Sequence, residues 1–154
     1  MNEYIIAQSR DEYAAAAGLF SEYAKWLGID LGFQHFEEEL LTLEKMYASP
    51  TGGIILCKQQ NDFIGCVAIR KITNDIAELK RMYVQPQCQQ GGIGKTLLER
   101  ALIMAKKCDY STIRLDTLSS MLPAISLYKK YGFYEISPYY HNPDPTAVYL
   151  EKQL

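Results

Sequence analysis

The sequence lacks the features that would direct it to a membrane or to nucleic acid. It contains no apolar run of about 18 residues, the length that a membrane-spanning helix requires. It begins Met-Asn-Glu-Tyr-Ile-Ile-Ala-Gln-Ser-Arg, with no basic leader before an apolar stretch. The formal net charge is -2, so no positive field attracts nucleic acid or an anionic membrane surface. We therefore expect a cytoplasmic protein with neither partner.

Residues that bind metals or form disulfides are also few and scattered. The four cysteines, Cys57, Cys66, Cys88 and Cys108, include no C-x-x-C pair, and two of them stand in apolar runs. The two histidines show no metal-ligand spacing. We expect reduced core thiols and no metal.

The composition favours one globular domain. The chain has 154 residues, of which 48% are apolar and 22% charged. This is long enough for one hydrophobic core and too short for two ordinary domains. We predict a single domain over residues 1–154.

The pattern of apolar residues predicts an α/β protein with a mixed sheet. The first half predicts a strand at 4–8, a helix that begins with the Ser-x-x-Glu capping box of residues 9–12 and continues to Leu27, and a second helix over about 34–47. Three strands follow at 54–58, 63–72 and 76–85, and their short connections make them antiparallel neighbours. A helix at 96–107 and a strand at 112–118 imply one parallel crossover. A helix at 123–131 and strands at 133–136 and 147–152 complete the chain.

The stretch Cys-Gln-Gln-Gly-Gly-Ile-Gly-Lys-Thr at 88–96 ends like a nucleotide phosphate loop. That loop has the pattern G-x-x-x-x-G-K-[ST], but Gln89 stands where its first glycine is required. The dinucleotide pattern G-x-G-x-x-G fails as well, because Leu97 replaces its last glycine. A glycine-rich turn that opens a helix still offers free N–H groups and a favourable dipole to an anion. The stretch therefore predicts a phosphate cradle, although not a nucleotide switch.

Written as Gln89-x-x-Gly92-x-Gly94, the same stretch has the pattern [Q/R]-x-x-G-x-[G/A] that binds the pyrophosphate of coenzyme A. Ala124, Leu127 and Tyr128, followed by Gly132-Phe133, come later at the matching spacing. With these motifs the chain resembles the GNAT superfamily of N-acetyltransferases over nearly its whole length. The resemblance implies the GNAT fold, a central mixed β-sheet flanked by helices, and direct transfer of acetyl from acetyl-CoA to a primary amine in a ternary complex.

The resemblance also implies which residues bind the cofactor. They come from the strand before the turn, the turn itself and the later helix: Met82, Tyr83, Val84, Gln89, Gln90, Gly91, Gly92, Ile93, Gly94, Lys95, Thr96, Ala124 and Leu127. One position departs from the family pattern, because Met121 stands where many relatives have asparagine. The contact of that asparagine with the pantetheine arm is then lost, or is made by Ser119 or Ser120.

The strand before the turn shows a slip in its alternation. Leu79, Met82 and Val84 are apolar, so the period of two is broken between Leu79 and Met82. A β-bulge there would leave backbone groups free for the pantetheine amides and the thioester carbonyl, in a region where the family is known to splay its strands. The alternative is a regular edge on which Arg81 faces solvent.

Two residues are candidates for catalysis. Tyr128 resembles the general acid of the family: its phenol, with a pKa of about 10 against about 8.5 for a thiol, can donate a hydrogen bond or hand its proton to the departing CoA thiolate. Tyr131, one turn further on, is the alternative, although the spacing from the glycines favours Tyr128. Glu78 precedes Gly94 by sixteen residues, as the catalytic glutamate does in the histone-acetylating branch of the family. Its alternative role is a surface ion pair near Lys80 and Arg81.

Acceptor recognition is expected from the early helices and the loop before the last strand. His35, Tyr139 and Tyr140 are the predicted substrate contacts. With Glu37 and Glu38 they would form an aromatic and acidic wall that suits a cation. The alternative for the run of glutamates at 37–39 is a solvated helix face.

The resemblance leaves three further hypotheses open. The acyl donor could be another acyl-CoA, such as succinyl- or propionyl-CoA. The chain could instead be a CoA-binding sensor or interaction domain with little catalysis. A homodimer formed through the last strands is common among relatives.

Overall fold

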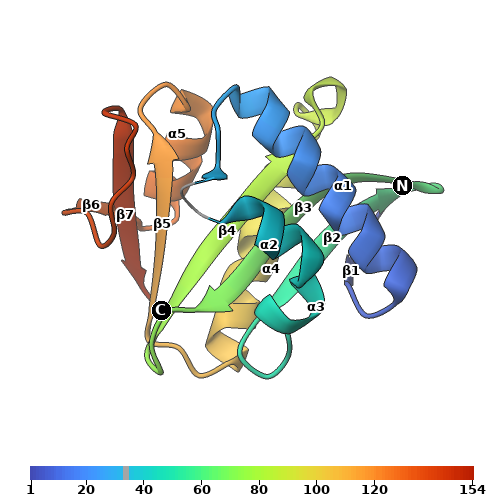
Figure 1. Cartoon of the computed structure of the whole chain (residues 1–154), viewed down its shortest axis with the longest axis horizontal. Coiled ribbons are helices and arrows are strands. Elements are labelled where there is room, and N and C mark those ends of the chain that lie inside the picture. Colours follow the sequence, from blue (N-terminus) through green and yellow to red (C-terminus); the bar gives the residue numbers. More distant parts are fainter. Residues whose placement is uncertain (33–34) are drawn as a thin grey trace.

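The computed structural model describes residues 1–32 and 35–154. Its centre is one seven-stranded sheet with the order β1-β2-β3-β4-β5-β7-β6 (Figure 1). Only β4 and β5 pair in parallel, whereas all other neighbours are antiparallel. The predicted mixed sheet with a single parallel crossover is confirmed. The strands are β1 (Asn2–Ile6), β2 (Gly53–Gln59), β3 (Asp62–Lys71), β4 (Ile76–Val84), β5 (Thr112–Leu118), β6 (Tyr134–Ile136) and β7 (Ala147–Gln153).

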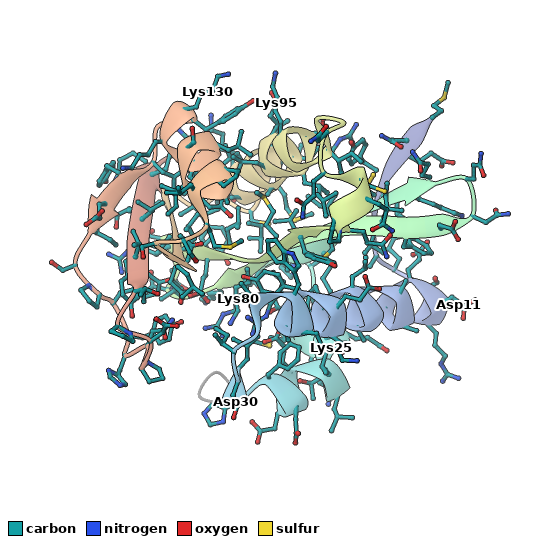
Figure 2. All side chains as sticks on the ribbon, turned by 90° about the horizontal axis from the view of Figure 1, so that it is seen from above. Asp11, Lys25, Asp30, Lys80, Lys95 and Lys130 are labelled. Atoms are coloured by element: carbon teal, nitrogen blue, oxygen red, sulfur yellow. The ribbon has the colours of Figure 1, made fainter. Side chains whose placement is uncertain are left out.

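Helices cover both faces of the sheet. One face carries α1 (Arg10–Leu27), α2 (Phe36–Leu41) and α3 (Leu43–Met46), and the other carries α4 (Ile93–Lys107) and α5 (Leu122–Lys130) (Figures 1 and 2). Both faces are covered because β2 is apolar on both sides. Ile54 and Leu56 belong to the core under α1, whereas Ile55 and Cys57 belong to the core under α4. Cys57 and Cys66 are buried free thiols as expected, but Cys88 and Cys108 are only half-buried.

Local signals fix the ends of the long helices. In the capping box of α1, the Glu12 amide donates to Ser9 Oγ at 3.2 Å and the Ser9 amide donates to Glu12 Oε1 at 3.0 Å. Gly28 ends this helix with φ 70°. The helix predicted from residue 96 begins earlier, at Ile93, because Gly92 takes the N-cap position.

The prediction of one helix over 34–47 is wrong. Two short helices, α2 and α3, replace it, with Thr42 between them at φ −129°. The Thr42 hydroxyl donates to the backbone carbonyl of Glu38 at 2.8 Å, so this side chain caps the end of α2. The break turns Leu43 and Tyr47 into the core, where the ring of Tyr47 meets that of Phe20 at 6.0 Å. Residue 34 lies outside the described residues.

The predicted bulge in β4 is confirmed. Cys66 pairs with Tyr83 and Ala68 pairs with Lys80, so two residues of β4 face one residue of β3. The extra residue is Arg81, whose φ is 58°. Its exposed fraction is 5%, which excludes the alternative that it faces solvent.

The parallel pair of β4 and β5 separates halfway along the strands. The two strands pair from Ile76 opposite Thr112 to Glu78 opposite Arg114 and no further, and Figure 1 shows them diverging beyond that point. The separation begins just before the bulge, so one edge of β4 faces a cleft instead of a neighbouring strand.

Candidate active site

The first hollow is the cleft between the diverging strands, with a volume of about 50 Å³. Leu79 to Met82 of β4 form one wall and Leu115 to Leu118 of β5 form the other. Met121, Ala124 and Tyr128 of α5 lie at the same cleft. Because the sheet ladder stops at Glu78, the backbone groups of β4 beyond it can bond to a bound molecule.

Tyr128 and Tyr131 point to different environments. Tyr128 has an exposed fraction of 5%, packs on Phe133 with ring centroids 5.5 Å apart, and lines the cleft. Burial raises the pKa of Tyr128 well above 10, so its phenol stays protonated near neutral pH. Tyr131 instead donates to Glu99 on α4 at 3.0 Å and does not line the cleft. The geometry therefore places Tyr128, and not its neighbour, beside the splayed strands.

The glycine turn leads from β4 through a 3₁₀ turn, Pro86–Cys88, into α4. Gly92 has φ 75°, and no side chain caps the first turn of the helix. The side-chain Nε2 of Gln89 donates to the backbone carbonyl of Val84 at 3.0 Å and so ties the turn to the end of the strand. The uncapped N–H groups fit the predicted role as a cradle for phosphate.

The predicted cofactor residues differ in what they can offer. Met82 and Ala124 line the cleft. The side chain of Tyr83 points to the opposite face, where its ring lies 5.8 Å from that of Trp26. Ile93 is buried in the core, with an exposed fraction of 2%, so only its backbone can contact a ligand. Gln90, Gly91 and Lys95 are exposed at the turn, Gly94 and Thr96 are half-buried there, and Leu127 packs on the core.

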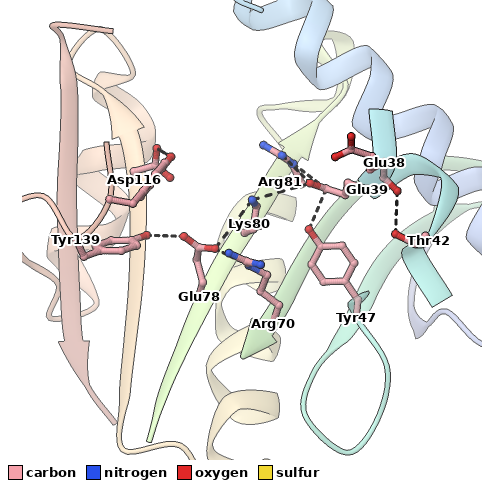
Figure 3. A network of polar contacts seen from close by, with 11 residues as sticks. Glu38, Glu39, Thr42, Tyr47, Arg70, Glu78, Lys80, Arg81, Asp116 and Tyr139 are labelled. Carbon is pink, nitrogen blue, oxygen red and sulfur yellow. Dashed lines mark hydrogen bonds and ion pairs between the residues drawn. The ribbon is translucent and has the colours of Figure 1, made fainter. Parts of the chain in front are cut away.

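A buried ion pair anchors α2 to the bulge (Figure 3). Glu39 accepts two hydrogen bonds from Arg81, at 2.8 and 3.0 Å, and a third from the Tyr47 hydroxyl at 2.9 Å. Burial favours the neutral acid, but the bonds and charge of Arg81 hold the pKa of Glu39 below its ordinary value. The solvated-face alternative is therefore wrong for Glu39, although Glu37 and Glu38 are exposed.

Glu78 forms the second pair of this network. Its Oε1 accepts from Arg70 Nε at 2.7 Å, and its Oε2 accepts from the Tyr139 hydroxyl at 2.7 Å. The residue has an exposed fraction of 3%. It is thus a buried ion-pair partner, chiefly of Arg70, whereas the alternative to catalysis was a surface ion pair near Lys80 and Arg81. Burial and the charge of Glu78 raise the pKa of Tyr139 far above its ordinary value.

Lys80 stands between the two pairs and forms only long ion pairs with their carboxylates (Figure 3). Its Nζ lies 3.9 Å from Glu39 Oε1 and 4.0 Å from Glu78 Oε1, beyond hydrogen-bond distance. The side chain has an exposed fraction of 8%. Burial, together with the charge of Arg81, lowers the pKa of Lys80 to about 8.

A second hollow of about 420 Å³ brings the predicted substrate residues together. His35, Tyr139 and Tyr140 all line it, as does Glu78. His35 lies at its exposed rim, with Nδ1 3.1 Å from Glu38 Oε2. The sequence placed these residues in separate segments, and the fold gathers them in one place.

Three residues of the site were missed in the sequence. Glu39 stands three residues after Phe36 and four before Leu43, on the apolar stripe, which is the signal that could have revealed its burial. Asp116 lines the cleft and accepts hydrogen bonds from the Tyr140 hydroxyl and, at 3.0 Å, from Asn142 Nδ2. A charged residue inside the apolar strand was its signal. Lys80 had no signal beyond its position before the bulge.

Within residues 1–32 and 35–154, no three histidine, cysteine, aspartate or glutamate side chains gather as a metal site would need. None of the helices described is both long and apolar enough to cross a bilayer.

The family model and the N-acetyltransferase relatives show that this protein is an acyltransferase, and the splayed strands and glycine turn on the mixed sheet agree with that class. The chain belongs to the acetyltransferase (GNAT) family, whose model matches residues 5–133.

Individual relatives agree with this assignment. An uncharacterised N-acetyltransferase of Schizosaccharomyces pombe is 36% identical over 138 residues, covering 88% of this chain and 85% of the relative. A protein of Azospirillum brasilense named IAA acetyltransferase is 33% identical over 156 residues and matches along 100% of both chains. The crystal structure of an acetyltransferase from Streptococcus agalactiae superposes with a TM-score of 0.83 at 20% identity, over 99% of this chain and 98% of that one. This last similarity shows the fold.

Proposed function

We propose that residues 1–154 form one N-acetyltransferase domain that transfers the acetyl group of acetyl-CoA directly to a primary amine in a ternary complex. The observation that carries the proposal is the position of Tyr128 beside the cleft where β4 leaves β5, next to an uncapped glycine turn. Family membership supports the same activity.

Acetyl-CoA fits the cleft in two parts. The uncapped N–H groups at the start of α4 suit the pyrophosphate, because a helix N-terminus favours an anion. The unpaired edge of β4 beyond Glu78 suits the amides of the pantetheine arm, which would continue the ladder that β5 leaves. Met121 caps α5 without a side-chain hydrogen bond, so the backbone must supply most contacts there.

The reaction forms a bond between the amine nitrogen and the thioester carbon and breaks the bond between that carbon and sulfur. Tyr128, whose buried phenol stays protonated, gives its proton to the departing thiolate and takes up the proton that the amine nitrogen loses as the amide forms, so no phenolate is left. The acceptor ammonium must first lose a proton. The Tyr139 hydroxyl already donates a hydrogen bond to Glu78. When the Tyr139 oxygen takes a proton from the ammonium, the hydroxyl can pass its own proton on to Glu78. We assign Glu78 this indirect role as base.

The test is release of free thiol from acetyl-CoA with a panel of primary amines, comparing Tyr128→Phe with Tyr131→Phe. We expect turnover in the parent and in Tyr131→Phe, and a large loss in Tyr128→Phe. Turnover with succinyl- or propionyl-CoA alone would support another acyl donor. Thermal stabilisation by CoA without turnover of any amine would support the sensor hypothesis.

A further inference from the structure

Three cations and two carboxylates form one network between the cleft and the second hollow. Arg70, Lys80 and Arg81 are the cations, and Glu39 and Glu78 are the carboxylates. Hydrogen bonds at 2.7 to 3.0 Å join Arg81 to Glu39 and Arg70 to Glu78, so both carboxylates are neutralised by arginines. Glu39 and Glu78 therefore offer little negative charge to a cationic substrate.

Lys80 is the cation of this network without a close partner. Its Nζ has only two long ion pairs, at 3.9 Å to Glu39 Oε1 and 4.0 Å to Glu78 Oε1, and its side chain has an exposed fraction of 8%. Figure 2 contrasts its position inside the molecule with that of Lys25, which projects from α1. A ligand carboxylate would give this ammonium an acceptor at hydrogen-bond distance.

Lys80 also has a special place between the hollows. Of all the described residues, it alone lines both the cleft between β4 and β5 and the second hollow. An acceptor that enters through the second hollow and reaches the thioester in the cleft must pass this side chain. A group bound by Lys80 is therefore close to the amine that reacts.

We call the place where Lys80 lines both the cleft and the second hollow the junction. On its cleft side the junction carries a negative charge, opposite to that of Lys80. Asp116 lines the cleft, and its Oδ2 is oriented by Tyr140 and Asn142. Asp116 and Lys80 thus lie on opposite walls of the diverging strands, as Figure 3 shows. Among the described residues, the other ionisable groups that line the second hollow, apart from the tyrosines, are His35 and Glu38, which contact each other at its exposed rim. The junction suits a ligand that is positive at one end and negative at the other.

We propose that the acceptor is an amino-acid-like zwitterion, a primary amine with a carboxylate close to it. Lys80 binds the carboxylate at the junction, with Arg70 beside it, and the amine faces Asp116 and the thioester. This inference rests on the proposed acetyltransferase function and names the substrate class of the same site.

The experiment uses matched acceptors with the full chain. Each α-amino acid is compared with the amine formed by removing its carboxylate and with its carboxamide, which keeps the size but not the charge. We expect kcat/KM for thiol release to be at least about tenfold higher for the amino acid, because a charge-assisted hydrogen bond is lost in the other two. Equal rates for all three would overturn the proposal.

Variants assign the effect to Lys80. Lys80→Met should reduce kcat/KM for the amino acid to the level of its carboxamide, while the value for the carboxamide changes little. Lys80→Arg should restore part of the preference, and the exposed Lys25→Met should behave as the parent. A Lys80→Met variant that slows all acceptors equally would contradict the assignment. Retained thermal stability shows that this variant is folded.

Binding separates the two proposals. Calorimetry with the CoA-saturated protein measures the affinity for each acceptor without requiring turnover. Tighter binding of the amino acid to the parent than to Lys80→Met, without acetylation, would support the zwitterion site and reject the transferase function. Acetylation of amines without any preference for the carboxylate would support the transferase function and reject the zwitterion site.

Discussion

Arg81 and Glu39 join two distant parts of the chain through a bidentate ion pair. Arg81 Nε lies 3.0 Å from Glu39 Oε2, and Arg81 Nη2 lies 2.8 Å from Glu39 Oε1, across a sequence separation of 42 residues. The side chains have exposed fractions of 4% and 1%. The bulge residue of β4 is thereby fastened to α2, which lines the second hollow. The pair holds the walls of the cleft and of the second hollow in one arrangement.

Removing one partner of this pair should destabilise the fold strongly. Glu39→Gln keeps the shape of the side chain but removes the buried negative charge that pairs with Arg81. We expect a loss of about 3–5 kcal/mol in the free energy of unfolding, measured by urea denaturation. The matched control is Glu37→Gln, an exposed glutamate of the same helix, with an expected change within about 0.5 kcal/mol. Similar small changes in both variants would mean that the pair contributes little.

Tyr128→Phe should separate catalysis from binding. Loss of the phenol removes the proton donor to the thiolate, so kcat should fall by about 10²–10⁴, while KM for acetyl-CoA changes little. Steady-state thiol release measures both quantities. Tyr131→Phe, which loses only the bond to Glu99, should retain the parent kcat. A comparable fall in both variants would reject Tyr128 as the acid.

The sequence predicted the sheet well because its signals are local. The strand at 112–118 was predicted with the bounds that β5 has, since alternation and the preceding helix both act over a few residues. The bulge at Arg81 was predicted from a slip in alternation of the same strand. The gathering of His35 and Tyr139 around one hollow followed from the family resemblance, and the structure shows them together there.

The features that were missed depend on contacts between distant segments. The burial of Glu39 depends on Arg81, and no pattern along the helix could identify that partner. The break at Thr42 depends on Tyr47 reaching Phe20 across the core. The position of Lys80 between two hollows arises only when β4 leaves β5, because the same residue in a regular sheet would face one neighbour.

Two glycines of the turn should respond differently to alanine. Gly92 has φ 75°, a left-handed conformation that costs an alanine about 1–2 kcal/mol. Gly94 lies inside α4 with no heavy atom within 4 Å of an added Cβ, so alanine there should leave stability equal or improve it by up to about 1 kcal/mol. Thermal unfolding of the free protein measures both effects.

The same pair of variants tests the phosphate cradle. The pattern [Q/R]-x-x-G-x-[G/A] requires glycine at position 92 but admits alanine at position 94. Gly92→Ala disturbs the left-handed turn that opens α4, where the pyrophosphate is proposed to bind, so it should weaken acetyl-CoA binding in calorimetry. Gly94→Ala should keep the parent affinity. Parent-like affinity in both variants would move the phosphates away from the turn.

The last prediction concerns the pH dependence that Lys80 gives to stability. Its pKa is about 8 in the folded protein and 10.5 in the unfolded chain. Between these values the folded state has released the proton and the unfolded state still binds it, so the free energy of unfolding should rise with pH, by up to about 1.4 kcal/mol per pH unit. Buried Cys66, whose pKa is raised, acts in the opposite direction above about pH 9, because only the unfolded thiol ionises there.

The contribution of Cys66 cancels when the unfolding free energies of the parent and of Lys80→Met are subtracted, because both proteins retain Cys66 and every buried tyrosine. The difference in unfolding free energy, parent minus variant, should increase from pH 7.5 to pH 10 in urea titrations. A difference that stays constant would mean that Lys80 keeps its ordinary pKa and is solvated in the folded state. In the presence of a bound amino acid the rise should begin at higher pH, because a carboxylate beside Lys80 stabilises its charged form and raises its pKa.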